Sequence, residues 1–156
     1  MTLTQGQELK EFNQLYREID ELYHIIAVKM GLSDSAFMIF YTLCDIGDGC
    51  MQKDICRMAS MSKQTIHSAV RKMEREGYLV QKPGKGRDKH LLFTEKGRAF
   101  ADEKILPVVN MENQVFAEML PKERNELLRL TRKYRELMQK KTEELLKNER
   151  EDMKCR

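Results

Sequence analysis

Residues 62–76 combine small polar and basic side chains with the periodicity of a helix. Three apolar residues, Ile66, Val70 and Met73, recur at steps of four and three, which predicts one buried face. Gln can pair bidentately with adenine, Ser and Thr can contact bases or phosphates, and Arg and Lys can contact phosphates or guanine. This pattern favours a helix that reads duplex DNA. The residues expected on its exposed face are Ser62, Lys63, Gln64, Thr65, His67, Ser68, Arg71 and Lys72.

A second cationic segment follows this helix after Gly77. The runs 78–82 and 90–94 are short and β-prone, and the residues between them are rich in Pro, Gly and cations. The sequence therefore predicts a β-hairpin. We expect its tip, which carries Lys85, Arg87 and Lys89, to enter an adjacent minor groove or to lie along its phosphates.

The distribution of charge supports a phosphate-facing centre. The net charge of the 156-residue chain is +3, whereas residues 51–90 hold ten basic and four acidic side chains. A basic centre between mildly acidic flanks is typical of a nucleic-acid-binding module on a non-binding scaffold. The alternative is a solvated surface whose charge is merely uneven.

Helices must hold these two segments in place. Charged residues make up 34% of the chain and Gly and Pro are few, which favours a mainly α fold. We expect a helix that is capped by Ser33 or Ser35 and runs to Ile46, followed by a short helix near 52–58 and a tight connection. Ser62 then caps the next helix, and its side chain accepts a hydrogen bond from the amide of Thr65. Gly77 ends that helix. The order of these elements predicts a winged helix-turn-helix.

Long helices are also expected at both ends of the chain. One covers 7–31, with an apolar stripe at Leu9, Phe12, Tyr16, Ile19, Tyr23, Ile26 and Met30. The helix capped by Thr94 contains Pro107, near which we expect a kink or a break, and Pro121 opens a last helix that frays after Leu146. A small winged-helix core cannot cover all of this apolar surface. We therefore expect a homodimer formed by 7–31 and 97–147, with a core at 33–96 and a charged tail at 148–156.

The central segments resemble a known family. The runs QKDIC (52–56), MSKQTIH (61–67) and RKMEREGYL (71–79) are similar to the core of MarR-family regulators. The runs GRDK (86–89) and FTEKG (93–97) are similar to that family's wing and next helix. The resemblance implies a single MarR-like domain, a homodimer, an inverted-repeat operator and often release from DNA by a small ligand or oxidant. It also implies that Arg87 contacts the minor groove.

The sequence does not decide between a regulatory and a purely structural role for two groups of residues. An aromatic effector could bind between the first two helices, at Tyr16, Tyr23, Phe37, Phe40 and Tyr41, although aromatics at helical spacing are more often core residues. A redox switch could use Cys44, Cys50 or Cys56, although a buried cysteine more often acts as a small hydrophobe. The default in a reducing cytosol is free thiols.

Other functional classes find little support. The sequence contains no Gly-rich phosphate loop, nucleophile elbow or zinc-ligand spacing, so we expect no enzyme activity, cofactor or metal. It contains no membrane-length apolar run and no signal peptide, which favours a cytoplasmic protein. A winged helix that binds proteins would carry few cations on the recognition face, and a membrane-surface helix would carry them along its own length. We therefore expect a sequence-specific regulator of transcription, most simply a repressor.

Overall fold

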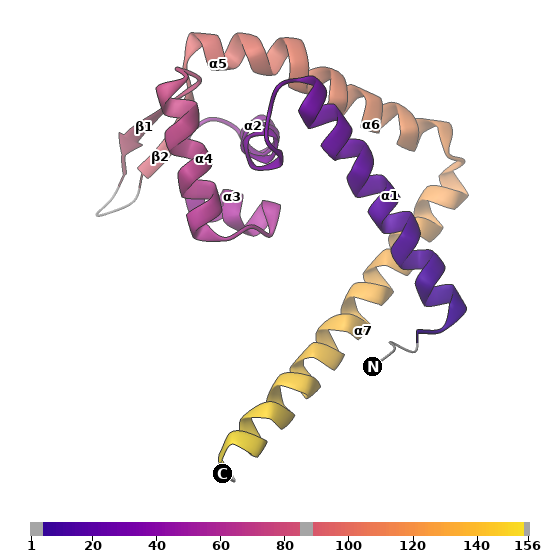
Figure 1. Cartoon of the computed structure of the whole chain (residues 1–156). Coiled ribbons are helices and arrows are strands. Elements are labelled where there is room, and N and C mark those ends of the chain that lie inside the picture. The colour runs from indigo at the N-terminus through magenta and orange to yellow at the C-terminus, as the bar shows by residue number, and fades with distance from the viewer. Residues whose placement is uncertain (1–4, 85–88, 155–156) are drawn as a thin grey trace. The chain divides into compact units, whose positions relative to one another are not determined.

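The computed structural model describes residues 5–84 and 89–154, with side chains as far as residue 147. The elements are α1 (Gln7–Lys29), α2 (Asp34–Ile46), α3 (Gln52–Ala59), α4 (Lys63–Arg75), β1 (Leu79–Pro83), β2 (Lys89–Phe93), α5 (Glu95–Phe100), the π-helical η1 (Ala101–Ile105), α6 (Leu106–Glu118) and α7 (Pro121–Lys154) (Figure 1). The chain divides into two compact units, 1–109 and 110–156. The expected mainly α fold with one antiparallel hairpin is confirmed.

Short polar side chains start three helices of the first unit. Ser33 Oγ accepts from the amide of Ala36 at 3.3 Å, and Ser62 Oγ accepts from the amide of Thr65 at 3.1 Å. Thr94 Oγ1 accepts from the amide of Gly97 at 3.0 Å. Each cap satisfies an amide that the first helical turn leaves without a partner. The predicted caps Ser33, Ser62 and Thr94 are therefore confirmed.

One apolar core joins the helix-turn-helix to the hairpin. Helix α2 packs against α3 and α4, and its Phe40 is fully buried. The Phe40 ring lies 5.5 Å from the ring of Phe93 on β2 and 4.8 Å from the ring of Phe100 on α5. Aromatic pairs at these separations add to the stabilisation from burial. The hairpin, α4 and the end of α5 are thus all packed against α2 in one core.

The junction between the hairpin and α5 is tightly packed. The hydroxyl of Thr94 donates to the carbonyl of Gly77 at 2.6 Å, and the amide of Thr94 donates to the carbonyl of Tyr78 at 3.1 Å. A Cβ atom at Gly97 would overlap that carbonyl of Tyr78. Gly77 has φ of +78°, as its predicted role at the end of α4 requires. Two glycines therefore allow the chain to turn from α4 through the hairpin into α5.

The predicted irregularity near Pro107 takes the form of a π-helical segment. Residues 95–118 are helical throughout, with η1 directly before the first turn of α6, where Pro107 lies. Proline lacks an amide hydrogen and crowds the carbonyl of the preceding turn, and a wider π turn accommodates both effects. The helix therefore continues past Pro107 without a break.

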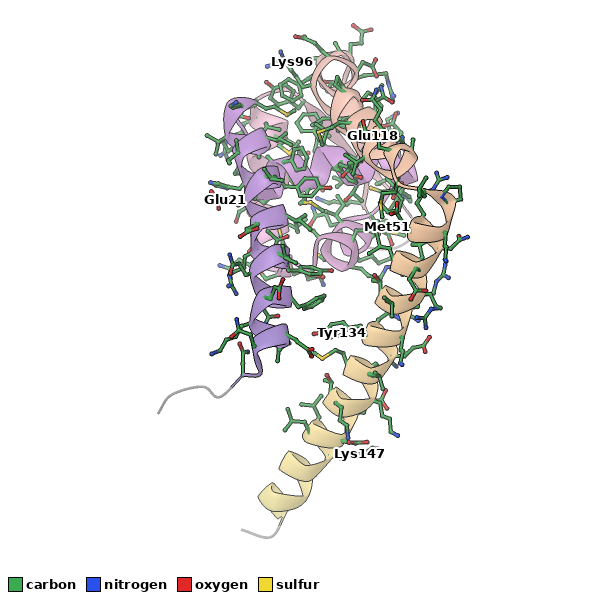
Figure 2. The ribbon with its side chains drawn as sticks, turned by 90° about the vertical axis from the view of Figure 1, so that its right-hand side faces the viewer. Glu21, Met51, Lys96, Glu118, Tyr134 and Lys147 are labelled. Carbon is green, nitrogen blue, oxygen red and sulfur yellow. The ribbon has the colours of Figure 1, made fainter. Side chains whose placement is uncertain are left out.

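The second unit consists of the rest of α6 and the 34-residue α7. The predicted fraying after Leu146 is wrong, because α7 continues to Lys154. Glu, Lys, Arg and Met dominate this stretch, and all are good helix formers. Side chains project from α7 around the helix, as Tyr134 and Lys147 illustrate (Figure 2).

Among the described residues, no single helix has both the length and the apolar composition to cross a membrane, although α1 and α2 meet those limits when they are taken together across a bend of 93°.

Candidate nucleic-acid interface

Helix α4 separates an apolar face from a polar face. Ile66 and Val70 are 0% exposed and Met73 is 1% exposed, so the predicted buried face is confirmed. The predicted polar residues are all exposed: Ser62, Lys63, Gln64, Thr65, His67, Ser68, Arg71 and Lys72. The helix therefore presents one polar, cationic surface to solvent.

The start of α4 offers hydrogen-bond donors to an anion. The hydroxyls of Ser62 and Thr65 lie 2.8 Å apart, so these two residues contact each other as well as the backbone. No acidic residue occupies the first turn, which begins with Lys63. A helix N-terminus carries a partial positive charge and amides that can donate to phosphate. This end of α4 is thus well suited to a nucleic-acid backbone.

One lysine in the later part of α4 pairs with a carboxylate. Lys72 Nζ lies 3.8 Å from Glu76 Oε1, and both side chains are largely exposed. An exposed pair of this kind contributes little to stability, but the carboxylate offsets part of the lysine charge. Arg71 and Arg75 also lie in this part of α4, so it remains cationic.

Hydrogen bonds tie the hairpin to α4 and to the residues just before α3. The side-chain amide of Gln81 on β1 donates to Glu74 Oε2 on α4 at 2.7 Å. On β2, Leu91 donates its amide to the carbonyl of Cys50 at 2.9 Å, just before α3. His90 Nδ1 lies 2.5 Å from the carbonyl of Gly49. The base of the hairpin is therefore fixed to α4 and to the residues just before α3.

These contacts form a cleft of about 350 Å³ between three elements. Its lining comes from α3 and the residue before it, from α4 and from the hairpin: Met51, Gln52, Lys53, Lys63, His67, Gln81 and Lys89. Met51 marks the start of α3 (Figure 2). Among the described residues, three lysines line this cleft and no carboxylate does. The structure therefore brings Lys63, His67 and Lys89 together, as one continuous cationic surface requires.

Two predicted site residues lie outside the described part of the chain, and several residues that line the cleft were not predicted. Lys85 and Arg87 lie outside the described residues, so their predicted DNA contacts stay predictions. Gln52, Lys53 and Gln81 were not among the predicted site residues. One feature of the sequence could have indicated Lys53: it lies at the start of α3, the first helix of the helix-turn-helix, and in such proteins this helix crosses the DNA backbone.

The five aromatic residues of the predicted effector pocket do not form one group. Tyr23, Phe37 and Tyr41 form a chain of rings, with centroids 6.4 Å and 6.0 Å apart. Phe40 instead packs against Phe93 and Phe100, because it lies on another face of α2. Tyr16 is 56% exposed and contacts Phe12. An effector site between α1 and α2 stays a prediction, with Tyr23, Phe37 and Tyr41 as its best-placed members.

Two of the three candidate thiols, Cys44 and Cys50, are poorly suited to redox sensing. Burial, followed by the charge of Asp54, raises the pKa of Cys50 to about 11. Burial also raises the pKa of Cys44, with a smaller contribution from Asp102. The thiolate is the reactive form, so both shifts lower reactivity near neutral pH. Among the described residues, no group of three or more His, Cys, Asp or Glu side chains could hold a metal ion.

The fold and the cationic surface define a winged helix-turn-helix protein. Residues 30–88 match the sequence model of the MarR family, and the predicted resemblance to that family is confirmed. None of the curated proteins compared with the chain gives a match.

Solved structures extend the similarity beyond the winged helix. NMB1585, a MarR family regulator from Neisseria meningitidis, has 23% identity and a TM-score of 0.77, over 89% of this chain and 99% of its own. A MarR family regulator from Listeria monocytogenes, solved with a 26mer DNA, has 20% identity and a TM-score of 0.66, over 88% and 90%. MarR from Staphylococcus aureus, solved with salicylate and kanamycin, has 17% identity and a TM-score of 0.66, over 86% and 91%. At these identities the similarity concerns the fold.

Proposed function

We propose that this protein is a transcription regulator that binds double-stranded DNA in a sequence-specific manner. The observation that carries this proposal is the cleft in which lysines from α3, α4 and β2 meet beside the exposed face of α4. Lysines on three elements can neutralise phosphates, while Gln64 and its neighbours face outward to contact base edges. The DNA complex of the Listeria regulator supports the same use of this fold.

The protein acts as a homodimer in this proposal. Large apolar side chains on α1 are exposed, including Leu15 at 53% and Leu22 at 60%. In the second unit, Leu120 is 64% exposed and Leu145 is 60% exposed. Burial of such side chains against a second copy stabilises a two-fold dimer. Two copies would place their recognition helices about 34 Å apart, which suits an inverted repeat.

The simplest regulatory scheme is repression by a cytoplasmic dimer that occupies an operator. A small aromatic effector would release it by favouring a conformation whose recognition helices no longer match the half-site spacing. The salicylate complex of the Staphylococcus aureus protein supports an aromatic effector. The rings of Tyr23, Phe37 and Tyr41 are the first residues to examine for its binding.

Selection of bound duplexes from a random pool tests this function. The proposal expects an enriched inverted repeat whose half-sites are centred about one helical turn, or a multiple of it, apart. Sedimentation at micromolar concentration should report a dimer. Failure to enrich any sequence would contradict sequence-specific binding, and a folded monomer would contradict the two-fold scheme.

A further inference from the structure

The cleft between α3, α4 and the hairpin is lined by one histidine. His67 of α4 shares the lining with Lys63 of the same helix, Lys53 of α3 and Lys89 of β2. The neutral groups around it come from Met51, Gln52 and Gln81. Arg71 lies one turn further along α4, and the nearby carboxylate of Glu74 accepts a hydrogen bond from Gln81. Among the described residues that line the cleft, the charged side chains are therefore all cationic.

The base of the cleft also holds an unused acceptor. Gln81 donates through its amide nitrogen to Glu74, and this contact fixes the orientation of the amide group because a carboxylate can only accept. The other amide atom, Gln81 Oε1, is buried and has no hydrogen-bond partner among the described residues. A buried acceptor without a partner is costly, so it attracts a donor. The lysine ammonium groups that line the same cleft are donors that can reach such an acceptor.

We propose that this cleft clamps one backbone phosphate of the duplex and that His67 binds the phosphate as an imidazolium ion. A phosphate diester brings negative charge against the imidazole ring, which favours its protonated form, in which both ring nitrogens donate. Lys53, Lys63 and Lys89 supply the remaining positive charge. Binding of DNA therefore takes up a proton at His67. This inference rests on the proposed function and assigns His67 to the backbone rather than to a base.

The direction of the pH dependence follows from this uptake. The form that holds the phosphate is the protonated one, so affinity is highest at acidic pH and falls as the pH rises. A one-unit difference in proton affinity between free and bound states corresponds to about a tenfold change in the binding constant. We expect a loss of about that size between pH 5.5 and pH 8.0 at constant ionic strength.

The experiment measures affinity for one selected duplex across this pH range in wild type, His67→Gln and His24→Gln. His67 is exposed, so its substitution leaves the core intact. The His67→Gln protein should bind with an almost flat pH profile and match wild type most closely at pH 8.0. His24 lies on α1 and pairs with Asp34, so His24→Gln should keep the wild-type profile. The same slope in His67→Gln as in wild type would overturn the proposal.

Two further readouts separate this clamp from general binding. Calorimetry in buffers of different ionisation enthalpy should report proton uptake by wild type and none by His67→Gln. Replacing single phosphates of the duplex with neutral methylphosphonates should abolish that uptake at one position in each half-site. Tight binding without any uptake would refute the clamp and leave the proposed function standing, whereas no duplex binding by wild type would refute both.

Discussion

Replacing Gly97 with Ala tests how strictly the hairpin junction is packed. In an ordinary helix interior this change stabilises a protein by about 1 kcal/mol, because Ala is the better helix former. At this site the new methyl group would overlap the carbonyl of Tyr78 and lie 3.1 Å from the ring of Phe93. Overpacking of this kind costs about 1–3 kcal/mol, and here the contact is with backbone. We therefore expect Gly97→Ala to lower the free energy of unfolding, although the higher helix propensity of Ala alone would raise it.

The assay is denaturant unfolding followed by circular dichroism at one fixed protein concentration. Gly6→Ala is the matched control, since a Cβ at Gly6 meets no atom within 4 Å and the residue lies just before α1. The control should lose no more than about 1 kcal/mol, because Gly6 is the N-cap of α1 and Ala caps a helix less well than Gly. An increase in the stability of Gly97→Ala would refute the packing described for the junction.

Three further predictions concern α4, α1 and the buried thiols. Ser62→Ala should destabilise the protein by about 1 kcal/mol because it removes the cap on the amide of Thr65, and an unchanged unfolding midpoint would contradict this. The hydrogen bond and then the charge of Asp34 raise the pKa of His24 above 6.5, so this pair stabilises the fold at acidic pH and loses that effect as the pH rises through the raised value. The stability difference between wild type and His24→Gln should therefore shrink from pH 5.5 to pH 8.5, and a constant difference would argue against the pair. Cys50, with a pKa of about 11, should resist alkylation at pH 7.5 in the folded protein, and rapid labelling seen by peptide mass spectrometry would disprove its shielding.

Local features of the DNA-facing helix could be predicted from the sequence. The cap at Ser62, the turn at Gly77 and the buried positions Ile66, Val70 and Met73 depend on neighbouring residues and on helical period. Capping, positive φ and amphipathic spacing act over one or two turns, so a single sequence reveals them.

Features that depend on distant segments could not be predicted. Gln52 and Gln81 meet in the cleft only because β2 pairs with the residues before α3 and β1 bonds to α4. Phe40 is predicted to line a pocket between the first two helices, but its ring partners lie on the hairpin and on α5. In both cases tertiary packing decides which face of an element is used, and local periodicity carries no such information.

The salt dependence of duplex binding tests the central claim most directly, which is that α3, α4 and the hairpin form one surface for DNA. The slope of log K against log salt should be steep in wild type and shallower in each of Lys53→Gln, Lys63→Gln and Lys89→Gln. The three lysines share one phosphate, so no single variant should change the slope by more than about 0.9. Lys104→Gln is the control, because Lys104 lies on η1 and pairs with Glu103. Its slope should equal that of wild type. Equal slopes in all four variants and wild type would contradict the account.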